Sequence, residues 1–292
     1  MGRVYKAFEK AQQEEQVFSE GVEHKTSTMN QRPPSKPQAK SGAKAPSPAA
    51  DQVRNLIVSR WDERLAIATD PKSQIAETFN RLRSKILHPP TGTPPPRTIL
   101  LTSATPKEGK GFICANLGFA LARGMSHHAL LVDCDLRKPT LAGLFGQTDD
   151  HGLSDYLQNK ADLSDLIRKT GMPKLSFIAG GPTPINPAEL LDSQKMSVLI
   201  KELASRYSDR FILFDTPPSI VASETMVLSR YVDGVIIVVR WGESDRAEIK
   251  RLVDAIGRDK IIGIVFNAYE KSSIEKFLSN KRTYGNYYGY YK

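Results

Sequence analysis

The sequence has few cysteines, and their scarcity excludes several classes of protein. Its 292 residues include only two, Cys114 and Cys134. Two distant thiols do not form the disulfide framework of a small secreted domain. There is no CxxC pair, and the five histidines show no metal-ligand spacing, so a zinc site is not expected. We predict that both thiols are small core residues in a reducing compartment.

The sequence also lacks long apolar runs and recognisable targeting signals. Its longest runs, such as 235–239 and 261–266, are strand-sized, whereas a membrane-spanning helix needs about 20 apolar residues. The N-terminus has no apolar region of a signal peptide, and Lys6 stands where a myristoylation signal needs Ser or Thr. We therefore expect a cytoplasmic protein, in which any membrane role must come through a partner. The net charge of +9 fits anionic partners without identifying them.

The chain divides into four parts by composition. Apolar residues at helical spacing near the N-terminus predict a helix, and the polar stretch after it has too few large apolar residues to fold. A tyrosine-rich segment ends the chain. The predicted parts are an N-terminal helix at 1–18, a flexible Pro/Ser/Ala/Lys-rich linker at 19–55, a globular domain at 56–271 and a disordered tail at 272–292.

Within the globular part, strand and helix patterns alternate. Ile75, Phe79, Leu82 and Ile86 recur at the spacing of an amphipathic helix. Short apolar runs separated by helical segments predict an α/β fold, a parallel sheet flanked by helices on both faces, with ligands at the carboxyl ends of the strands. The expected strands are 98–102, 129–132, 211–214, 235–239 and 261–266, and the further helices are 111–124 and 245–256.

The loop from Ala104 to Gly111 follows a predicted strand and opens a predicted helix. This is the setting of a Walker A phosphate loop, in which backbone N–H groups cradle phosphates and a lysine, here Lys110, reaches the outer ones. Gly111 stands where the pattern has a Ser or Thr that binds Mg²⁺. A strand–turn–helix junction with a chance Gly-Lys pair is the alternative.

Carboxylates follow two other predicted strands. Asp133 and Asp135 come after the run 129–132, and Asp215 ends the run 211–214, as in a Walker B strand. Such carboxylates can accept a proton from an attacking hydroxyl and hold Mg²⁺. Arg137 can contact phosphate or lock the loop. The alternative is that these residues form solvated turns.

Taken together, the motifs resemble those of the bacterial protein-tyrosine kinases (BY-kinases) that regulate capsule and exopolysaccharide synthesis, P-loop proteins related to the MinD/ParA group. The resemblance extends over about 73–292. It rests on the loop 103–111, the D-x-D-x-R sequence at 133–137, the D-T-P-P sequence at 215–218 and the terminal tyrosines.

The resemblance implies ATP and Mg²⁺ as cofactors and assigns the site residues. Lys110 would stabilise charge on the phosphates, Asp135 and Asp215 would hold the metal, and Asp133 would be the base, although the roles of Asp133 and Asp135 are interchangeable at this stage. The residues expected at the nucleotide are Thr105, Pro106, Lys107, Glu108, Gly109, Lys110, Gly111, Phe112, Arg137 and Asn267.

The tail and the first helix of the domain carry the expected contacts with other chains. Five of the ten tyrosines lie in the last nine residues, and a terminal phenol cluster suits a phosphoacceptor; an aromatic stacking tail is the alternative. The expected phosphoacceptors are Tyr284, Tyr287, Tyr288, Tyr290 and Tyr291.

The resemblance further implies a ring-like homo-oligomer and a separate membrane adaptor of a polysaccharide export system, with no nucleic acid expected. Glu77 and Arg83 match the self-association motif of the family, whereas Asn80 replaces its middle arginine.

Two departures from the family pattern leave three functions open. Lys107 replaces a glycine and Gly111 replaces the metal-binding hydroxyl. The first function is a tyrosine autokinase, and the second is a degenerate nucleotide-binding homologue that acts as a scaffold or switch. The third is a MinD/ParA-like positioning ATPase, although Thr105 stands where such proteins carry an additional lysine.

Overall fold

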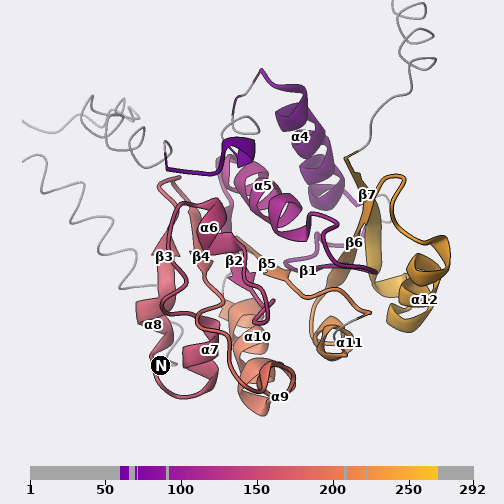
Figure 1. Cartoon of the computed structure of the whole chain (residues 1–292). Coiled ribbons are helices and arrows are strands. Elements are labelled where there is room, and N and C mark those ends of the chain that lie inside the picture. Colours follow the sequence, from indigo (N-terminus) through magenta and orange to yellow (C-terminus); the bar gives the residue numbers. More distant parts are fainter. Residues whose placement is uncertain are drawn as a thin grey trace, which may run out of the picture.

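The computed structural model describes residues 60–65, 70, 72–89, 92–206, 209–220 and 223–268. These residues form a seven-stranded sheet with helices on both faces (Figure 1). The predicted N-terminal helix at 1–18, the linker at 19–55 and the tyrosine tail at 272–292 lie outside the described residues.

The sheet is parallel except at one edge. Its strand order is β3-β4-β2-β5-β1-β6-β7, and only β3 runs antiparallel to its neighbour. The prediction of a parallel sheet is therefore confirmed, with β3 as an exception that the sequence did not indicate. The strands are β1 (Thr98–Ser103), β2 (His128–Asp133), β3 (Ile167–Lys169), β4 (Leu175–Ile178), β5 (Arg210–Asp215), β6 (Gly234–Arg240) and β7 (Ile261–Asn267).

The helices predicted from periodicity are also present. Each begins within about one residue of its expected start, and several short helices occur that had not been predicted. The helices are α4 (Gln74–Leu87), α5 (Lys110–Ala122), α6 (Leu141–Leu144), α7 (Leu153–Leu157), α8 (Leu163–Leu166), α9 (Pro187–Leu191), α10 (Gln194–Arg206), α11 (Glu224–Ser229) and α12 (Arg246–Ile256).

Successive residues of the central strands pack into two separate cores, one on each face of the sheet. In β1, Ile99 packs with the apolar residues of α4, α5 and α6, whereas Leu100 packs with those of α7, α10 and α12. This is the burial that two-sided helical cover requires. Cys114 and Cys134 are fully buried and unpaired, so the prediction of core thiols is confirmed.

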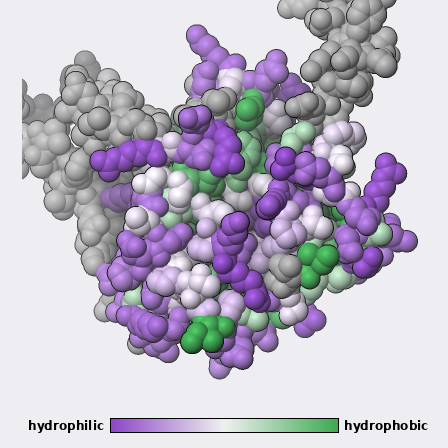
Figure 2. Space-filling view, in the orientation of Figure 1, coloured by the Kyte–Doolittle hydropathy of each residue, from purple (hydrophilic) through white to green (hydrophobic). Residues whose placement is uncertain are grey.

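The exposed face in Figure 2 is mainly hydrophilic, with a few separate apolar areas. Among the described residues, no helix is both long enough and apolar enough to span a membrane.

The topology brings the predicted motifs to one edge of the sheet. Strands β2, β5 and β1 are neighbours and parallel, and Asp133 pairs with Asp215 in the register of β2 and β5. Leu101 of β1 pairs with Asp215, so the phosphate loop after β1 begins beside these carboxylates. The candidate site therefore lies at the carboxyl ends of the three central strands.

Candidate functional site

The loop between β1 and α5 has the backbone that a phosphate loop requires. Gly109 caps α5 with a φ of 91°, and Lys107 has a φ of 65°. A positive φ is uncommon for lysine and costs about 1 kcal/mol relative to glycine. Lys107 therefore occupies a position that favours glycine, as the family pattern suggested.

Glu108 holds this loop together from inside. Its side chain is buried, and its Oε1 atom accepts hydrogen bonds from the N–H (2.9 Å) and the hydroxyl (2.6 Å) of Thr105. Its Oε2 atom accepts the N–H of Arg240, the last residue of β6, at 3.1 Å. The carboxylate of Glu108 thus supports the loop, and only its backbone remains available to a nucleotide.

Asn267, at the end of β7, packs directly on the loop. Its Nδ2 atom donates to the carbonyl of Glu108 at 2.8 Å, and a Cβ atom on Gly109 would lie 2.1 Å from that nitrogen. Gly109 is therefore required both by its positive φ and by this close approach. The contact of Asn267 with an adenine base stays a prediction.

Lys110 and Asp215 form the centre of the site. Lys110 is mostly buried, and its Nζ atom donates to the Ser103 hydroxyl at 3.2 Å. Burial raises the pKa of Asp215 to about 7, and the nearby charge of Lys110 only partly offsets this rise. The Oδ1 atom of Asp215 is buried without a hydrogen-bond partner, and its Oδ2 atom lies 3.5 Å from the Thr140 hydroxyl.

Asp133 is committed to the protein backbone. Its Oδ2 atom accepts the N–H groups of Thr140 (2.8 Å) and Leu141 (2.9 Å), and its Oδ1 atom accepts the N–H of Asp135 at 3.2 Å. The side chain is fully buried, and burial raises its pKa well above the usual range. Asp135 is only partly buried, and its carboxylate accepts the N–H of Lys138 at 3.1 Å.

Arg137 locks the loop that follows Asp135. Its guanidinium donates to the carboxylate of Glu224, at the start of α11, at 3.0 Å. The Glu224 side chain is 2% exposed and that of Arg137 is 43% exposed. The Arg137 guanidinium therefore covers the buried Glu224 carboxylate on its solvent side. Of the two predicted roles of Arg137, the structure shows the locking contact.

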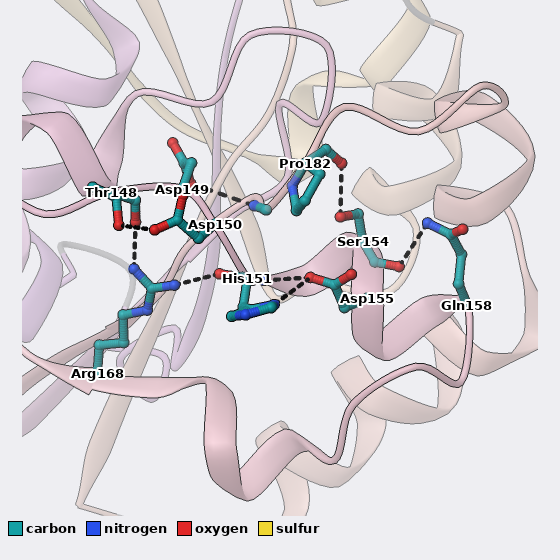
Figure 3. A network of polar contacts seen from close by, with 11 residues as sticks. Thr148, Asp149, Asp150, His151, Ser154, Asp155, Gln158, Arg168 and Pro182 are labelled. Atoms are coloured by element: carbon teal, nitrogen blue, oxygen red, sulfur yellow. Dashed lines mark hydrogen bonds and ion pairs between the residues drawn. The ribbon is translucent and has the colours of Figure 1, made fainter.

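A polar network connects β3, α7, the segment before α7 and the loop after β4 (Figure 3). Arg168 donates to the carbonyls of Thr148 and His151, and the Ser154 hydroxyl donates to the carbonyl of Pro182 at 2.9 Å. The contacts of Arg168 join β3 to the segment before α7, and the contact of Ser154 joins α7 to the loop after β4. A Cβ atom on Gly180 in that loop would lie 2.6 Å from Pro139, so this loop packs against the segment that follows the D-x-D-x-R sequence.

Three of the predicted residues lie on the α4 side of the domain. Phe112 packs edge-on against Phe79 of α4, with ring centroids 6.2 Å apart, so its partly buried side chain packs against the core. Glu77 pairs with Arg81 within α4 at 3.4 Å. The guanidinium of Arg83 lies beside Gly124, after the end of α5. The oligomer that Glu77 and Arg83 were expected to support stays a prediction.

The residues present fit a magnesium ion with a phosphate ligand. Mg²⁺ prefers oxygen ligands and is usually held by one or two carboxylates, substrate phosphates and water. The buried Oδ1 atom of Asp215 has no hydrogen-bond partner, so it can bind the ion with little rearrangement. Within the described ranges there is no cluster of three or more His, Cys, Asp or Glu side chains, so an all-protein metal cage is absent there.

Four residues that shape the site were not found from the sequence. Ser103 holds Lys110, Arg240 holds Glu108, Glu224 holds Arg137, and Thr140 lies beside Asp215. Except for Ser103, each lies far in sequence from the residue that it contacts. Only Ser103 had a sequence signal, as the first residue of the resembled loop.

The sheet order, the loop before α5 and the carboxylates after β2 and β5 define a P-loop nucleotide-binding domain. Comparisons with known proteins agree. Residues 99–286 match the family described as "CobQ/CobB/MinD/ParA nucleotide binding domain". The CapB protein of Staphylococcus aureus is 32% identical over 227 residues, which cover 77% of this chain and 95% of CapB.

Further relatives indicate the group within this family to which the chain is most similar. The tyrosine-protein kinase YwqD of Bacillus subtilis is 30% identical over 233 residues, which cover 79% of this chain and 93% of YwqD. The solved kinase domain of the Escherichia coli tyrosine kinase ETK superposes with a TM-score of 0.62 at 27% identity, covering 72% of this chain and 82% of that domain. The chain belongs to the CobQ/CobB/MinD/ParA family of nucleotide-binding domains, in its group of bacterial tyrosine-protein kinases.

Proposed function

We propose that this chain is an ATP-dependent protein-tyrosine autokinase that phosphorylates its C-terminal tyrosines in trans and regulates exopolysaccharide or capsule synthesis and export. The observation that carries the proposal is that Lys110, at the start of α5, lies near the buried Asp215, whose Oδ1 atom has no hydrogen-bond partner. A cation and a metal-binding carboxylate at a helix N-terminus suit the outer phosphates of a nucleotide.

The phosphate loop and Lys110 would bind and orient the nucleotide. The first N–H groups of a helix have no partner within the helix, and the helix dipole favours negative charge at this end of α5. Lys110 would leave the Ser103 hydroxyl and stabilise the charge that develops on the transferred phosphoryl group. Mg²⁺, held through Asp215, would neutralise phosphate charge.

The geometry favours Asp135 over Asp133 for orienting the attacking tyrosine. A base must come within hydrogen-bond reach of the hydroxyl that it activates. Both oxygens of Asp133 accept backbone N–H groups and its side chain has no exposed surface, whereas Asp135 is partly exposed at the same strand end. We therefore assign the proton acceptor to Asp135, as in the exchange of roles left open by the sequence, but we assign Asp133 to ordering the loop rather than to holding the metal.

The phosphoacceptors and partners follow from the resemblance to the kinases. The tyrosines of the tail, at 284, 287, 288, 290 and 291, would enter the site of a neighbouring subunit. A ring-like oligomer using Glu77 and Arg83 would present them. A separate membrane adaptor of the export system would recruit the cytoplasmic kinase to the inner face of the membrane.

A nucleotide-binding scaffold without kinase activity is the second candidate, because Gly111 brings no hydroxyl to the metal. A positioning ATPase has no support from the loop, since Thr105 bonds to Glu108 in place of the additional lysine of those proteins.

Mixing two variants tests the proposal. A Lys110→Met chain with an intact tail serves as acceptor, and a chain with its five tail tyrosines changed to phenylalanine serves as donor. We expect phosphotyrosine on the Lys110→Met chain only when the donor and Mg-ATP are both present. Phosphate on neither chain, while ATP still binds, would favour the scaffold.

A further inference from the structure

Gly111 leaves a space beside the first turn of α5, and a hydroxyl from another loop fills that space. At the point where residue 111 would carry a Cβ atom, the nearest atom is Thr140 Oγ1, at 2.3 Å. Asp215 Oδ2 lies 3.1 Å from the same point. A side chain at 111 and the present position of the Thr140 hydroxyl therefore exclude each other.

The Thr140 oxygen lies in the region that the missing loop hydroxyl would occupy. A serine or threonine at 111 would carry its oxygen one C–O bond from the Cβ position, beside Asp215. Thr140 Oγ1 is 3.5 Å from Asp215 Oδ2. Oxygens that bind adjacent positions of an octahedral Mg²⁺ are about 3 Å apart, so this pair is close to the required spacing.

Thr140 does not use its hydroxyl in the ordinary way for its position. It is the residue before α6, where a threonine usually accepts a hydrogen bond from an N–H of the helix, yet it makes no such bond. Asp133 caps this end of the helix instead, by accepting the N–H groups of Thr140 and Leu141. The same two bonds fix the backbone of Thr140, and its hydroxyl donates a hydrogen bond to Asp215 Oδ2.

We infer that Thr140 supplies, from the loop after β2, the metal-binding hydroxyl that Gly111 lacks in the phosphate loop. The inference rests on the proposed function, because it requires Mg²⁺ and a nucleotide to bind here. Gly111 leaves room for the Thr140 side chain. The hydroxyl that the family pattern has at position 111 is here supplied from position 140. The departure at Gly111 then leaves the oxygen ligands of the site complete.

The test measures the Mg²⁺ requirement of nucleotide binding to the full chain, with a fluorescent ADP analogue as probe. Thr140→Val keeps the shape of the side chain and removes the oxygen. We expect the Mg²⁺ concentration for half-maximal binding to rise about 10- to 100-fold, as when a metal-site partner is lost. Binding in excess EDTA should not change. Thr140→Ser should keep the original requirement, and so should Thr78→Val on α4, the matched control.

Variants at both positions, 140 and 111, test the same role without relying on Thr140→Val. Thr140→Ala alone should raise the Mg²⁺ requirement, and adding Gly111→Ser should restore it by returning the hydroxyl to the loop. Gly111→Ser alone should bind more weakly than this double variant, because its new Cβ meets the Thr140 hydroxyl.

The outcomes separate the inference from the proposed function. An unchanged Mg²⁺ requirement in Thr140→Val, or a double variant no better than Thr140→Ala, would overturn the role of Thr140 alone. A lower unfolding temperature without a change in the Mg²⁺ requirement would show a merely structural role. If Mg²⁺ has no effect on nucleotide binding to the unchanged protein, the proposed function fails and the inference fails with it.

Discussion

Asp215→Asn should stabilise the nucleotide-free protein, and the gain should grow with pH. Burial raises the pKa of Asp215 from 3.8 to about 7, so the folded state binds this proton more tightly than the unfolded state does. The stability contributed by the proton is complete below 3.8 and is lost as the pH rises through about 7. Asparagine does not ionise and avoids that loss.

The magnitude follows from the interval between the two pKa values. Each pH unit inside the interval costs the folded protein about 1.4 kcal/mol. Between pH 5 and pH 8 the advantage of Asp215→Asn should therefore increase by about 2–3 kcal/mol in free energy of unfolding.

Urea unfolding of both proteins at pH 5 and pH 8, without nucleotide, measures this difference. Asp62→Asn is the matched control, because pairing with Arg64 lowers the pKa of Asp62 to about 2. Both the folded and the unfolded pKa of Asp62 lie below pH 5, so its effect should be the same at both pH values. An advantage of Asp215→Asn that is independent of pH would refute the reasoning.

Two other substitutions test the loops of the site. Lys107→Gly should raise the free energy of unfolding by about 0.5–1 kcal/mol, because glycine accepts the φ of 65°, while ATP affinity falls if Lys107 adds positive charge near the phosphates. Calorimetric titration with ATP measures the second effect, and a higher affinity would contradict it. Arg137→Ala should lower the free energy of unfolding by about 2 kcal/mol, since it leaves the buried Glu224 carboxylate unpaired. Adding Glu224→Gln should recover most of that loss. Urea unfolding of the single and double variants measures both changes in the free energy of unfolding.

The sequence predicted most elements with a long apolar pattern, but the 13-residue helix α10 was missed although its buried residues recur at helical spacing. The helix at 75–86 and the strands at 98–102, 129–132 and 211–214 are confirmed within about two residues, because their apolar residues are buried on one or both sides. The edge strand β3 and its neighbour β4 were missed. They have three and four residues, too few for a period to show.

The site was predicted as a set of motifs, but its internal contacts were not. The sequence placed Asp133 and Asp135 at one strand end and left their roles interchangeable. Only the folded loop shows that Asp133 accepts backbone N–H groups at both oxygens. Thr140 and Gly111 are 29 positions apart, and nothing in their spacing indicates that a hydroxyl on one fills the space left by the other.

The most direct test of the central claim is a mass-spectrometric search for phosphotyrosine in the peptide that follows Arg282. The full chain would be incubated with Mg-ATP, with and without the cytosolic segment of its membrane adaptor, and Lys110→Met would be the control. The account predicts phosphate on tyrosines between Tyr284 and Tyr291 that is absent from the control. An unphosphorylated tail under both conditions, in a protein that still binds ATP, would contradict the account.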